Sequence, residues 1–323
     1  MNNCKVMEDV ECCIVGDPEG KSWDFITGVY DEVKGRDRWS LNEVEIKRFP
    51  DGEIKPKIKE NVRKRDCYFI HDSRKAPADW FLELCLINEA LRNSSANRIY
   101  NIFPYMRFVR QERKDESRVP ISSRVVADNI SRYANGVLTI DVHNQAIQGF
   151  YPSFDNLHSF RTVVDYFRKN HPEYIENVVV MSPDAGGGNR AEAFAKWIQA
   201  REIAIGAKHR DGDDVKIRLT GEVKDRNVII VDDIIASGTT LIEGSCAARQ
   251  EGARKVGVYA THGLFTEGLD RLEECLDFIV VGNTVVSPEI KNSGRVEVVD
   301  FSKLFGEAIR RVHRGESLSE LFK

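Results

Sequence analysis

The sequence lacks an excess of either charge. Its 47 lysine and arginine residues stand against 51 aspartate and glutamate residues, which leaves a net charge of -4. Domains that bind nucleic acid usually carry a large basic excess, so this balance argues against such a partner. The chain also lacks an apolar stretch long enough to cross a bilayer, and its first residues do not resemble a signal peptide. We therefore expect neither a nucleic-acid nor a membrane partner.

Paired cysteine motifs are also missing. The seven cysteines form no C-x-x-C spacing and no clusters, which indicates neither a zinc site nor a disulfide framework. Cys12, Cys13, Cys67 and Cys85 lie in apolar stretches, so we expect them to be buried thiols. Reduced thiols are typical of the cytoplasm, which is the expected location of the protein.

The patterns that are present predict an α/β fold. At 323 residues the chain is longer than one compact core usually holds, which favours two domains. Short apolar runs rich in β-branched residues predict buried strands. They lie at residues 11–16, 67–71, 98–103, 136–143, 177–182, 203–207, 227–233, 255–262 and 277–282. Helical spacing appears at 80–92, 121–133, 190–199 and 240–250. This alternation predicts mostly parallel sheets flanked by helices.

The two halves of the chain are alike in outline. Each contains a strand that ends in an acidic residue and continues into a polar loop, LTIDVHNQA in the first half and IIVDDIIASGTT in the second. The similarity predicts a duplicated fold, with a boundary near residues 152–161. We expect an N-terminal domain at 1–155 and a C-terminal domain at 156–323.

The strongest local motif lies at 228–241, with the sequence VIIVDDIIASGTTL. An apolar strand ends in Asp232 and Asp233, and a turn with Gly238 and three hydroxyl residues leads into a helix. Glycine allows close backbone approach, and the amides of a helix N-terminus attract anions. Adjacent carboxylates suit sugar hydroxyls or a magnesium ion. A simple N-capped helix is the alternative, but capping alone does not explain the double aspartate.

This motif resembles the phosphoribosyl-binding loop of the type I phosphoribosyltransferase superfamily. The resemblance implies that the acidic pair holds the ribose hydroxyls and that the following loop holds the 5-phosphate. The implied ribose 5-phosphate site consists of Asp232, Asp233, Ala236, Ser237, Gly238, Thr239 and Thr240.

Four further stretches resemble the ribose-phosphate diphosphokinases of that superfamily, and two of them concern ATP. In 48-RFPDGEIKPKIKENVRKRD-66, the resemblance implies an exposed hairpin on which Phe49 stacks on adenine while Asp51 and Glu53 accept hydrogen bonds. In 104-PYMRFVRQERKDESRVPISSRVVAD-128, it implies that Arg110 and Gln111 contact ATP across a subunit interface. The family sequence R-Q-D-R is R-Q-E-R here. Five basic residues crowd this second stretch, namely Arg107, Arg110, Arg113, Lys114 and Arg118.

The other two stretches concern metal. The pattern 141-DVHNQAIQGFY-151 implies that His143 is a magnesium ligand, although Asn144 stands where the family has alanine. The pattern 182-SPDAGGGNRAEAFAKW-197 implies a second magnesium ligand in Asp184 and a supporting role for Arg190. Beyond these, the stretch 203–214 falls where the family has a mobile catalytic loop. Lys208 and Arg210 match its two basic positions.

Taken together, these resemblances imply two phosphoribosyltransferase-like domains, with nucleotide on the N-terminal side and ribose 5-phosphate on the C-terminal side. The implied reaction transfers the β,γ-diphosphoryl group of ATP to O1 of ribose 5-phosphate, with Mg²⁺ as cofactor. They also imply a homo-oligomer built from dimers, up to a hexamer. Three alternatives remain: a non-catalytic regulatory paralogue, a phosphoribosyltransferase, and a diphosphokinase with another nucleotide donor or sugar acceptor.

Overall fold

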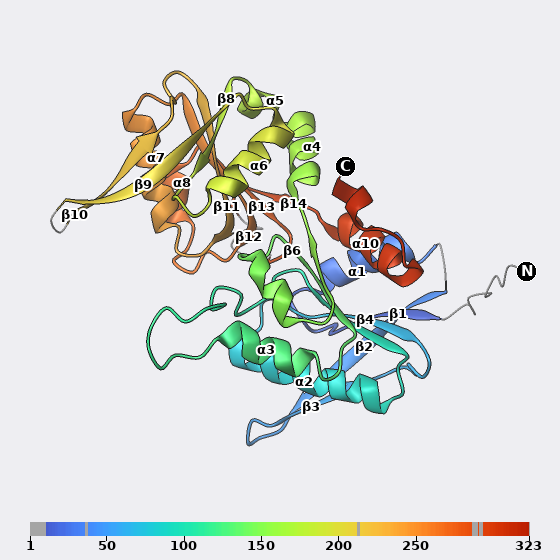
Figure 1. Cartoon of the computed structure of the whole chain (residues 1–323). Helices are drawn as coiled ribbons and strands as arrows, with labels where there is room; N and C mark the ends of the chain where they lie inside the picture. Colours follow the sequence, from blue (N-terminus) through green and yellow to red (C-terminus); the bar gives the residue numbers. More distant parts are fainter. Residues whose placement is uncertain (1–10, 36–37, 212–213, 286–289, 291–292, 323) are drawn as a thin grey trace, which may run out of the picture. The chain divides into compact units, whose positions relative to one another are not determined.

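The computed structural model describes residues 11–35, 38–211, 214–285, 290 and 293–322. Within these ranges the chain divides into two compact units (Figure 1). The first unit contains residues 11–157 together with 302–322, and the second contains the described residues between 158 and 301. Each unit is an α/β structure with its own sheet.

The sheet of the first unit has seven strands in the order β3-β2-β1-β4-β5-β6-β7. Only the edge pair β2–β3 is antiparallel, and the other neighbours are parallel. Strands β1, β4 and β6 are buried along their whole length, because helices cover both faces of a parallel sheet. In chain order the strands span Cys12–Gly16, Trp39–Arg48, Ile54–Ile58, Asp66–Ile70, Arg98–Phe103, Gly136–Ile140 and Phe154–Leu157.

The sheet of the second unit has seven strands in the order β10-β9-β8-β11-β12-β13-β14. Its edge pair β9–β10 is antiparallel and the rest are parallel. In chain order the strands span Val178–Ser182, Glu202–Asp211, Asp214–Thr220, Asn227–Ile235, Lys255–Gly263, Phe278–Gly282 and Val296–Val299. The strand order of the first sheet is thus repeated strand for strand, which is the topology expected of a duplicated fold. Both the α/β class and the mostly parallel sheets are confirmed.

Helices cover the faces of each sheet (Figure 1). The first unit has α1 at Trp23–Val33, α2 at Pro77–Asn93, α3 at Ser122–Ile130 and α10 at Ser302–Arg314, with 3-10 turns η1 at Gln145–Phe150 and η2 at Ser319–Phe322. The second unit has α4 at Phe160–Asn170, α5 at Pro172–Ile175, α6 at Gly188–Ile198, α7 at Thr239–Gln250 and α8 at Asp270–Cys275. All four segments with helical spacing in the sequence form helices.

Each unit has its own hydrophobic core between sheet and helices. In the first unit the indole of Trp80 is fully buried and lies against Phe103, with ring centroids 5.3 Å apart. In the second unit β11 and β12 contribute Val228, Ile230, Val256 and Val258 to the core, together with side chains from the neighbouring strands and helices. Cys12, Cys13 and Cys67 are buried thiols as expected, whereas Cys85 is only half-buried because it lies near the outer face of α2.

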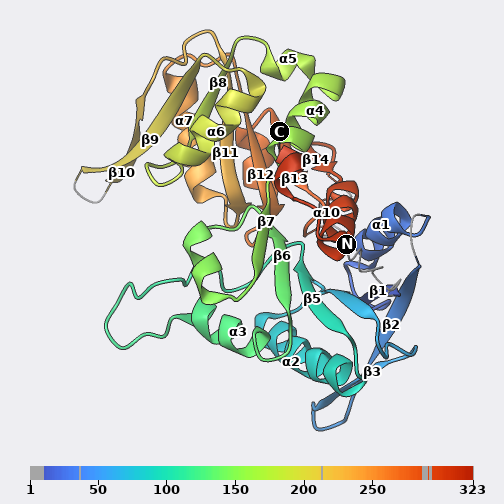
Figure 2. The ribbon, with the colours of Figure 1, turned by 45° about the vertical axis from the view of Figure 1, so that its right-hand side comes forward.

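The end of the chain differs from the expected division, in which 156–323 formed one domain. Helix α10 lies along α1 in both ribbon views and belongs to the first unit (Figure 2). Phe25 and Phe305 meet edge to face at 5.3 Å, and both are buried. A Cβ at Gly306 would lie 2.6 Å from the Cβ of Glu32, so glycine permits the close approach of the two helices. Each buried phenylalanine contributes roughly 2 kcal/mol to this attachment.

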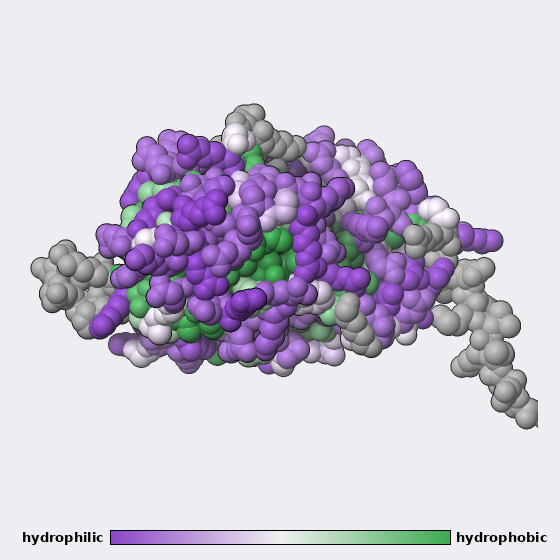
Figure 3. Space-filling model, turned by 90° about the horizontal axis from the view of Figure 1, so that it is seen from above, coloured by the Kyte–Doolittle hydropathy of each residue, from purple (hydrophilic) through white to green (hydrophobic). Residues whose placement is uncertain are grey.

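The surface of the molecule is mainly hydrophilic on the face shown in Figure 3, with small apolar areas between the polar side chains. Among the described residues, Leu82 and Val125 are the only large hydrophobic side chains classed as exposed. Within the same part of the chain, no helix combines the length and the hydropathy needed to cross a membrane.

Candidate active site

The phosphate-loop motif forms the strand, turn and helix predicted for it. The first five residues of β11 are buried, and the strand continues through Asp232 and Asp233 to Ile235. Backbone hydrogen bonds from Leu264 and Phe265 to the carbonyl of Ile235, and from Thr266 to that of Ala236, hold the turn at its base. These contacts fix the place where the chain leaves the sheet.

The turn itself depends on Gly238. Its φ of +82° lies in the left-handed region, and a Cβ there would lie 2.8 Å from the side chain of Leu272. The hydroxyls of Ser237 and Thr239 are 3.2 Å apart, and α7 begins at Thr239. The first turn of a helix leaves backbone N–H groups without partners in the helix, so it favours an anion. Hydroxyls and amides therefore gather at one place, as a phosphate site requires.

Arg190 on α6 joins the two carboxylates of the acidic pair. Its Nη1 lies 3.2 Å from Asp232 Oδ1 and 2.8 Å from Asp233 Oδ1. The Asp233 side chain is only 3% exposed, against 27% for Asp232 and 20% for Arg190. Burial and the neighbouring Asp233 raise the pKa of Asp232, while the charge of Arg190 lowers it. The pair is thus prearranged by a cation, a pairing that the sequence did not reveal.

Asp184 lies in the turn between β8 and α6, and β8 is the neighbour of β11 in the sheet. It is exposed, its Oδ1 accepts from the N–H of Gly187 at 3.0 Å, and its carbonyl accepts from the hydroxyl of Ser182 at 2.6 Å. The carboxyl ends of parallel strands meet at one edge of a sheet, which is where α/β proteins bind ligands. The second unit therefore brings Asp184, Arg190, the acidic pair and the turn to one edge.

The expected mobile catalytic loop at 203–214 is a strand over most of its length. The backbone of β9 runs to Asp211 and pairs with β10, with Lys208 opposite Ile217 and Arg210 opposite Val215. The expectation of a loop at Lys208 and Arg210 was wrong, because an antiparallel partner strand extends β9 beyond its apolar part. The side chains of these two residues lie outside the described part of the structure.

The nucleotide residues of the first unit lie on two separate turns. Phe49, Asp51 and Glu53 form the tip of the β2–β3 hairpin, where the N–H of Phe49 donates to the carbonyl of Glu53 at 2.8 Å. The Asp51 Oδ1 accepts from the Glu53 N–H at 3.1 Å, and both carboxylate residues are exposed. The ammonium of Lys47 lies 5.2 Å from the centre of the half-buried Phe49 ring. The tip thus presents an aromatic face and two acceptors.

Arg110 and Gln111 lie on the loop between β5 and α3. Buried Ser123 anchors this loop twice, since its hydroxyl donates to the Phe108 carbonyl at 2.6 Å and its N–H donates to the Gln111 carbonyl at 3.2 Å. Phe108 has a φ of +66°, which is unusual for a non-glycine residue. The anchored loop leaves Arg110 and Gln111 exposed.

Glu112, the next residue, is hydrogen-bonded to the strand end that carries His143. Asn144 Nδ2 donates to Glu112 Oε1 at 3.0 Å, and Asn144 Oδ1 accepts from the N–H of Ala146 at 3.0 Å. Burial acts against ionisation of Glu112, but its hydrogen bonds and the nearby His143 lower its pKa. Glu112 and Asn144 are two of the positions at which the sequence departs from the resembled family. The structure shows that these two departures contact each other.

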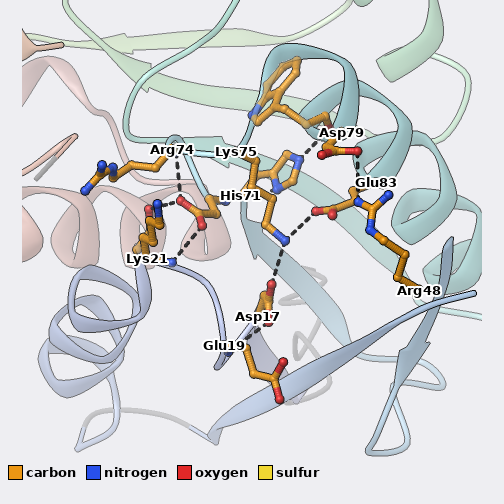
Figure 4. A network of polar contacts seen from close by, with 12 residues as sticks. Asp17, Glu19, Lys21, Arg48, His71, Arg74, Lys75, Asp79 and Glu83 are labelled. Atoms are coloured by element: carbon orange, nitrogen blue, oxygen red, sulfur yellow. Dashed lines mark hydrogen bonds and ion pairs between the residues drawn. The ribbon is translucent and has the colours of Figure 1, made fainter. Parts of the chain in front are cut away.

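In the first unit, an ion-pair network occupies the position that corresponds to the phosphate loop of the second unit. The strand β4 occupies the same position in its sheet as β11, and the turn after it contains Lys75. The Lys75 ammonium lies 2.7 Å from Asp17 and 2.6 Å from Glu83, and it is only 15% exposed (Figure 4). The neighbouring His71 is fully buried, which lowers its pKa to about 4. Its Nε2 donates to the Trp80 carbonyl at 2.7 Å. Side chains of the protein therefore fill this end of the first sheet.

Fold and site together define a class: a two-unit α/β protein with a hydroxyl-rich turn beside an acidic pair at the carboxyl edge of a parallel sheet. Residues 27–133 match the family model for the N-terminal domain of ribose phosphate pyrophosphokinase, and residues 207–323 match that of the phosphoribosyl synthetase-associated domain.

Individual relatives agree with the family models. The chain is 38% identical over 292 residues to the ribose-phosphate pyrophosphokinase of Haemophilus influenzae, covering 88% of this chain and 92% of that protein. It is 37% identical over 291 residues to that of Vibrio cholerae, with the same coverage of 88% and 92%. The crystal structure of phosphoribosylpyrophosphate synthetase from Mycobacterium smegmatis superposes with a TM-score of 0.84 at 29% identity, covering 95% of this chain and 99% of that one. The chain belongs to the ribose-phosphate pyrophosphokinase family, a family of diphosphotransferases.

Proposed function

We propose that the protein transfers the β,γ-diphosphoryl group of ATP to O1 of ribose 5-phosphate, with 5-phosphoribosyl 1-diphosphate and AMP as products. The observation that carries this proposal is the acidic pair Asp232–Asp233, held by Arg190 directly before the hydroxyl-rich turn. Adjacent carboxylates accept hydrogen bonds from vicinal hydroxyls, and the turn supplies donors for a phosphate. A sugar phosphate is the ligand that needs both.

The sugar-phosphate site positions the nucleophile. Residues 236–240 hold the 5-phosphate through backbone amides and the hydroxyls of Ser237, Thr239 and Thr240. The carboxylates of Asp232 and Asp233 accept from the ribose hydroxyls. Holding both ends of the sugar fixes the direction of O1, and such positioning is the main requirement of phosphoryl-transfer chemistry.

The nucleotide is held by the first unit. Phe49 stacks on adenine, and Asp51 and Glu53 accept hydrogen bonds from its amino group or from bound water. The guanidinium of Arg110 and the amide of Gln111 donate to the triphosphate. The carboxylates at the hairpin tip and the side chains of Arg110 and Gln111 suit these roles, since they are exposed and the turns that carry them are held by hydrogen bonds between backbone and side chains.

Magnesium is a hard cation that prefers oxygen ligands, and the second unit offers it an exposed carboxylate. Asp184 is an exposed carboxylate at a strand end of the second unit, and His143 is exposed after a strand of the first. Among the described residues no three His, Cys, Asp or Glu side chains cluster. Mg²⁺ usually takes one or two carboxylates and completes its shell with water and substrate phosphates, so a sparse site fits it. We assign Asp184 and His143 as its protein ligands, where it would neutralise phosphate charge.

The O1 hydroxyl attacks the β-phosphorus in line, the bond from the β-phosphorus to the α,β-bridging oxygen breaks, and AMP leaves with that oxygen. We assign Lys208 and Arg210 to the negative charge that develops on the transferring group. Preorganised donors of this kind typically contribute about 10²- to 10³-fold to kcat.

The proposal has two further parts. The active form is a homo-oligomer built from dimers. The thiols of the described cysteines suit a reducing cytoplasm as its location.

Two alternatives make different predictions. A non-catalytic paralogue should lack the acidic pair or the turn, but both are present, and Arg190 holds the acidic pair. A diphosphokinase with another donor or acceptor would keep the sugar-phosphate site and differ around 106–112 and 144–146. The Glu112–Asn144 hydrogen bond lies in that region, so donor preference has to be measured directly.

The test is to identify the nucleotide product. Purified protein is incubated with magnesium, ribose 5-phosphate and ATP, GTP or ADP, and the products are followed by ³¹P NMR and ion-exchange chromatography. We expect AMP and a C1 diphosphate ester from ATP. ADP as the product would indicate transfer of a single phosphoryl group and would refute the proposal. Asp233→Asn should lose turnover, whereas Asp225→Asn, at an exposed turn outside the site, should not.

A further inference from the structure

A small hollow lies at the carboxyl edge of the sheet of the first unit. It has a volume of about 190 Å³ and is lined by Pro77, Tyr105, Arg107, Phe108, Val109, Arg110 and Gln111. Pro77 begins the helix after β4, and the other residues follow β5, so the hollow lies where two adjacent parallel strands end. Ligands of α/β proteins bind at this edge. Whole small molecules usually occupy pockets of about 300–1,000 Å³, so this hollow suits one chemical group of a ligand.

Arg107 is the unusual member of the lining. Arg110, Arg113, Lys114 and Arg118 of the basic stretch are exposed, but Arg107 is half-buried. Its Nη2 donates to the carbonyl of Ser73 at 3.0 Å, and its guanidinium lies 5.9 Å from the centre of the Tyr105 ring. Its Nε is buried and has no acceptor among the described residues.

Arg107 also lacks a direct ion pair among the described residues, although Asp72 attracts its guanidinium electrostatically. Among the described residues no carboxylate lies within ion-pair distance of its guanidinium, and burial lowers its pKa. The nearby Lys75 shows the opposite arrangement, since Asp17 and Glu83 both contact it. The same end of the sheet thus pairs one cation with two carboxylates and leaves the other without a direct ion pair among the described residues. A half-buried charge in a cleft, perturbed by burial, is a common mark of a ligand site.

We infer that Arg107 is a further phosphoryl-binding residue beside Arg110 and Gln111, and that the phosphoryl group belongs to the phosphate chain of a nucleotide. The three side chains supply guanidinium and amide donors around a hollow of phosphoryl size, and the buried Nε of Arg107 has no acceptor among the described residues. The source of the group rests on the proposed function, whereas the oxyanion chemistry rests on the hollow alone. Free phosphate or diphosphate has the same chemistry, so the experiment separates these sources.

The experiment is calorimetric titration of the full chain with α,β-methylene-ATP, which cannot release AMP, and separately with inorganic diphosphate. Arg107→Met keeps an unbranched apolar side chain over Tyr105 but removes the charge. Arg107→Gln is a second variant that stays polar, for use if the first unfolds. The matched control is Arg113→Met, which removes the same charge from an exposed position outside the hollow.

We expect both Arg107 variants to bind the nucleotide analogue about 10- to 100-fold more weakly, since each lost charge-assisted pair changes affinity on this scale. A loss for the analogue alone identifies the nucleotide phosphate chain as the ligand, and an equal loss for diphosphate shows that the free anion also binds. Unchanged affinity in folded variants, or an equal loss in Arg113→Met, overturns the inference. If the parent makes no AMP but still binds through Arg107, the proposed reaction fails and the anion site stands.

Discussion

Replacing Arg190 tests how the acidic pair is held. In Arg190→Met the guanidinium is lost, and Asp232 and Asp233 are left as adjacent carboxylates without their cation. Breaking a buried ion pair costs about 3–5 kcal/mol. Arg190 keeps 20% of its side-chain exposure and Asp232 keeps 27%, so solvent screens part of the charge. We therefore expect a loss of about 3 kcal/mol in the free energy of unfolding at pH 8.

The loss of unfolding free energy in Arg190→Met should increase as the pH rises. The pKa of Asp232 is raised in the folded chain above its ordinary value of 3.8. At pH values between 3.8 and the raised pKa, the folded chain therefore binds more protons than the unfolded chain. Stability associated with this group therefore falls as pH rises through that window. Because Arg190 lowers this pKa, its removal raises it further and widens the window. The difference between parent and variant should therefore grow as the pH rises above about 8, the pKa of Asp232 in the parent.

Urea denaturation followed by circular dichroism at several pH values measures this difference, provided that the slope with urea is unchanged. Lys196→Met is the matched control on the same helix, because Lys196 forms an exposed ion pair with Glu192 and should not matter measurably. A difference that stays constant with pH, or one no larger than that of the control, would show that Arg190 does not hold the pair.

Two further substitutions test the turn and the loop. Gly238→Ala should lower the free energy of unfolding by about 2 kcal/mol and raise the KM for ribose 5-phosphate. The control Gly268→Ala, at a φ of +81° with open space around it, should cost about 1 kcal/mol and leave that KM unchanged. Equal KM values in the two variants would contradict this prediction. Glu112→Ala and Asn144→Ala, measured singly and together, should show a coupling of about 1 kcal/mol in the binding free energy of ATP, and additive effects would exclude a role for their hydrogen bond.

The fold was largely predictable because its signals are local. The centres of β8 and β11 are uninterrupted apolar runs at residues 178–181 and 228–231, which identifies strands buried on both faces. The phosphate turn was also predictable, since the acidic pair, Gly238 and the hydroxyl residues are consecutive. The edge strands β7 and β14 were missed because each has only four residues and carries partly exposed polar side chains.

The contacts that complete the site could not be predicted, because they join residues far apart in the chain. Arg190 and the acidic pair are 42 or more positions apart. Glu112 and Asn144 are 32 positions apart, and each alone appeared as a departure from the family pattern. Nothing in the local sequence of α10 distinguishes packing on α1 from packing on the second sheet, since an amphipathic helix fits either.

Because the C-terminal helix α10 belongs to the first unit, the order in which the two units are completed differs from the order in which they are synthesised. The segment 158–301 contains a complete sheet with its own core, so it has all the strands it needs before α10 has been translated. The half that leaves the ribosome first stays open along α1, with Phe25 uncovered, until residues 302–322 arrive. The part synthesised earliest is thus completed last, and during that interval its apolar flank is the one that needs protection from aggregation.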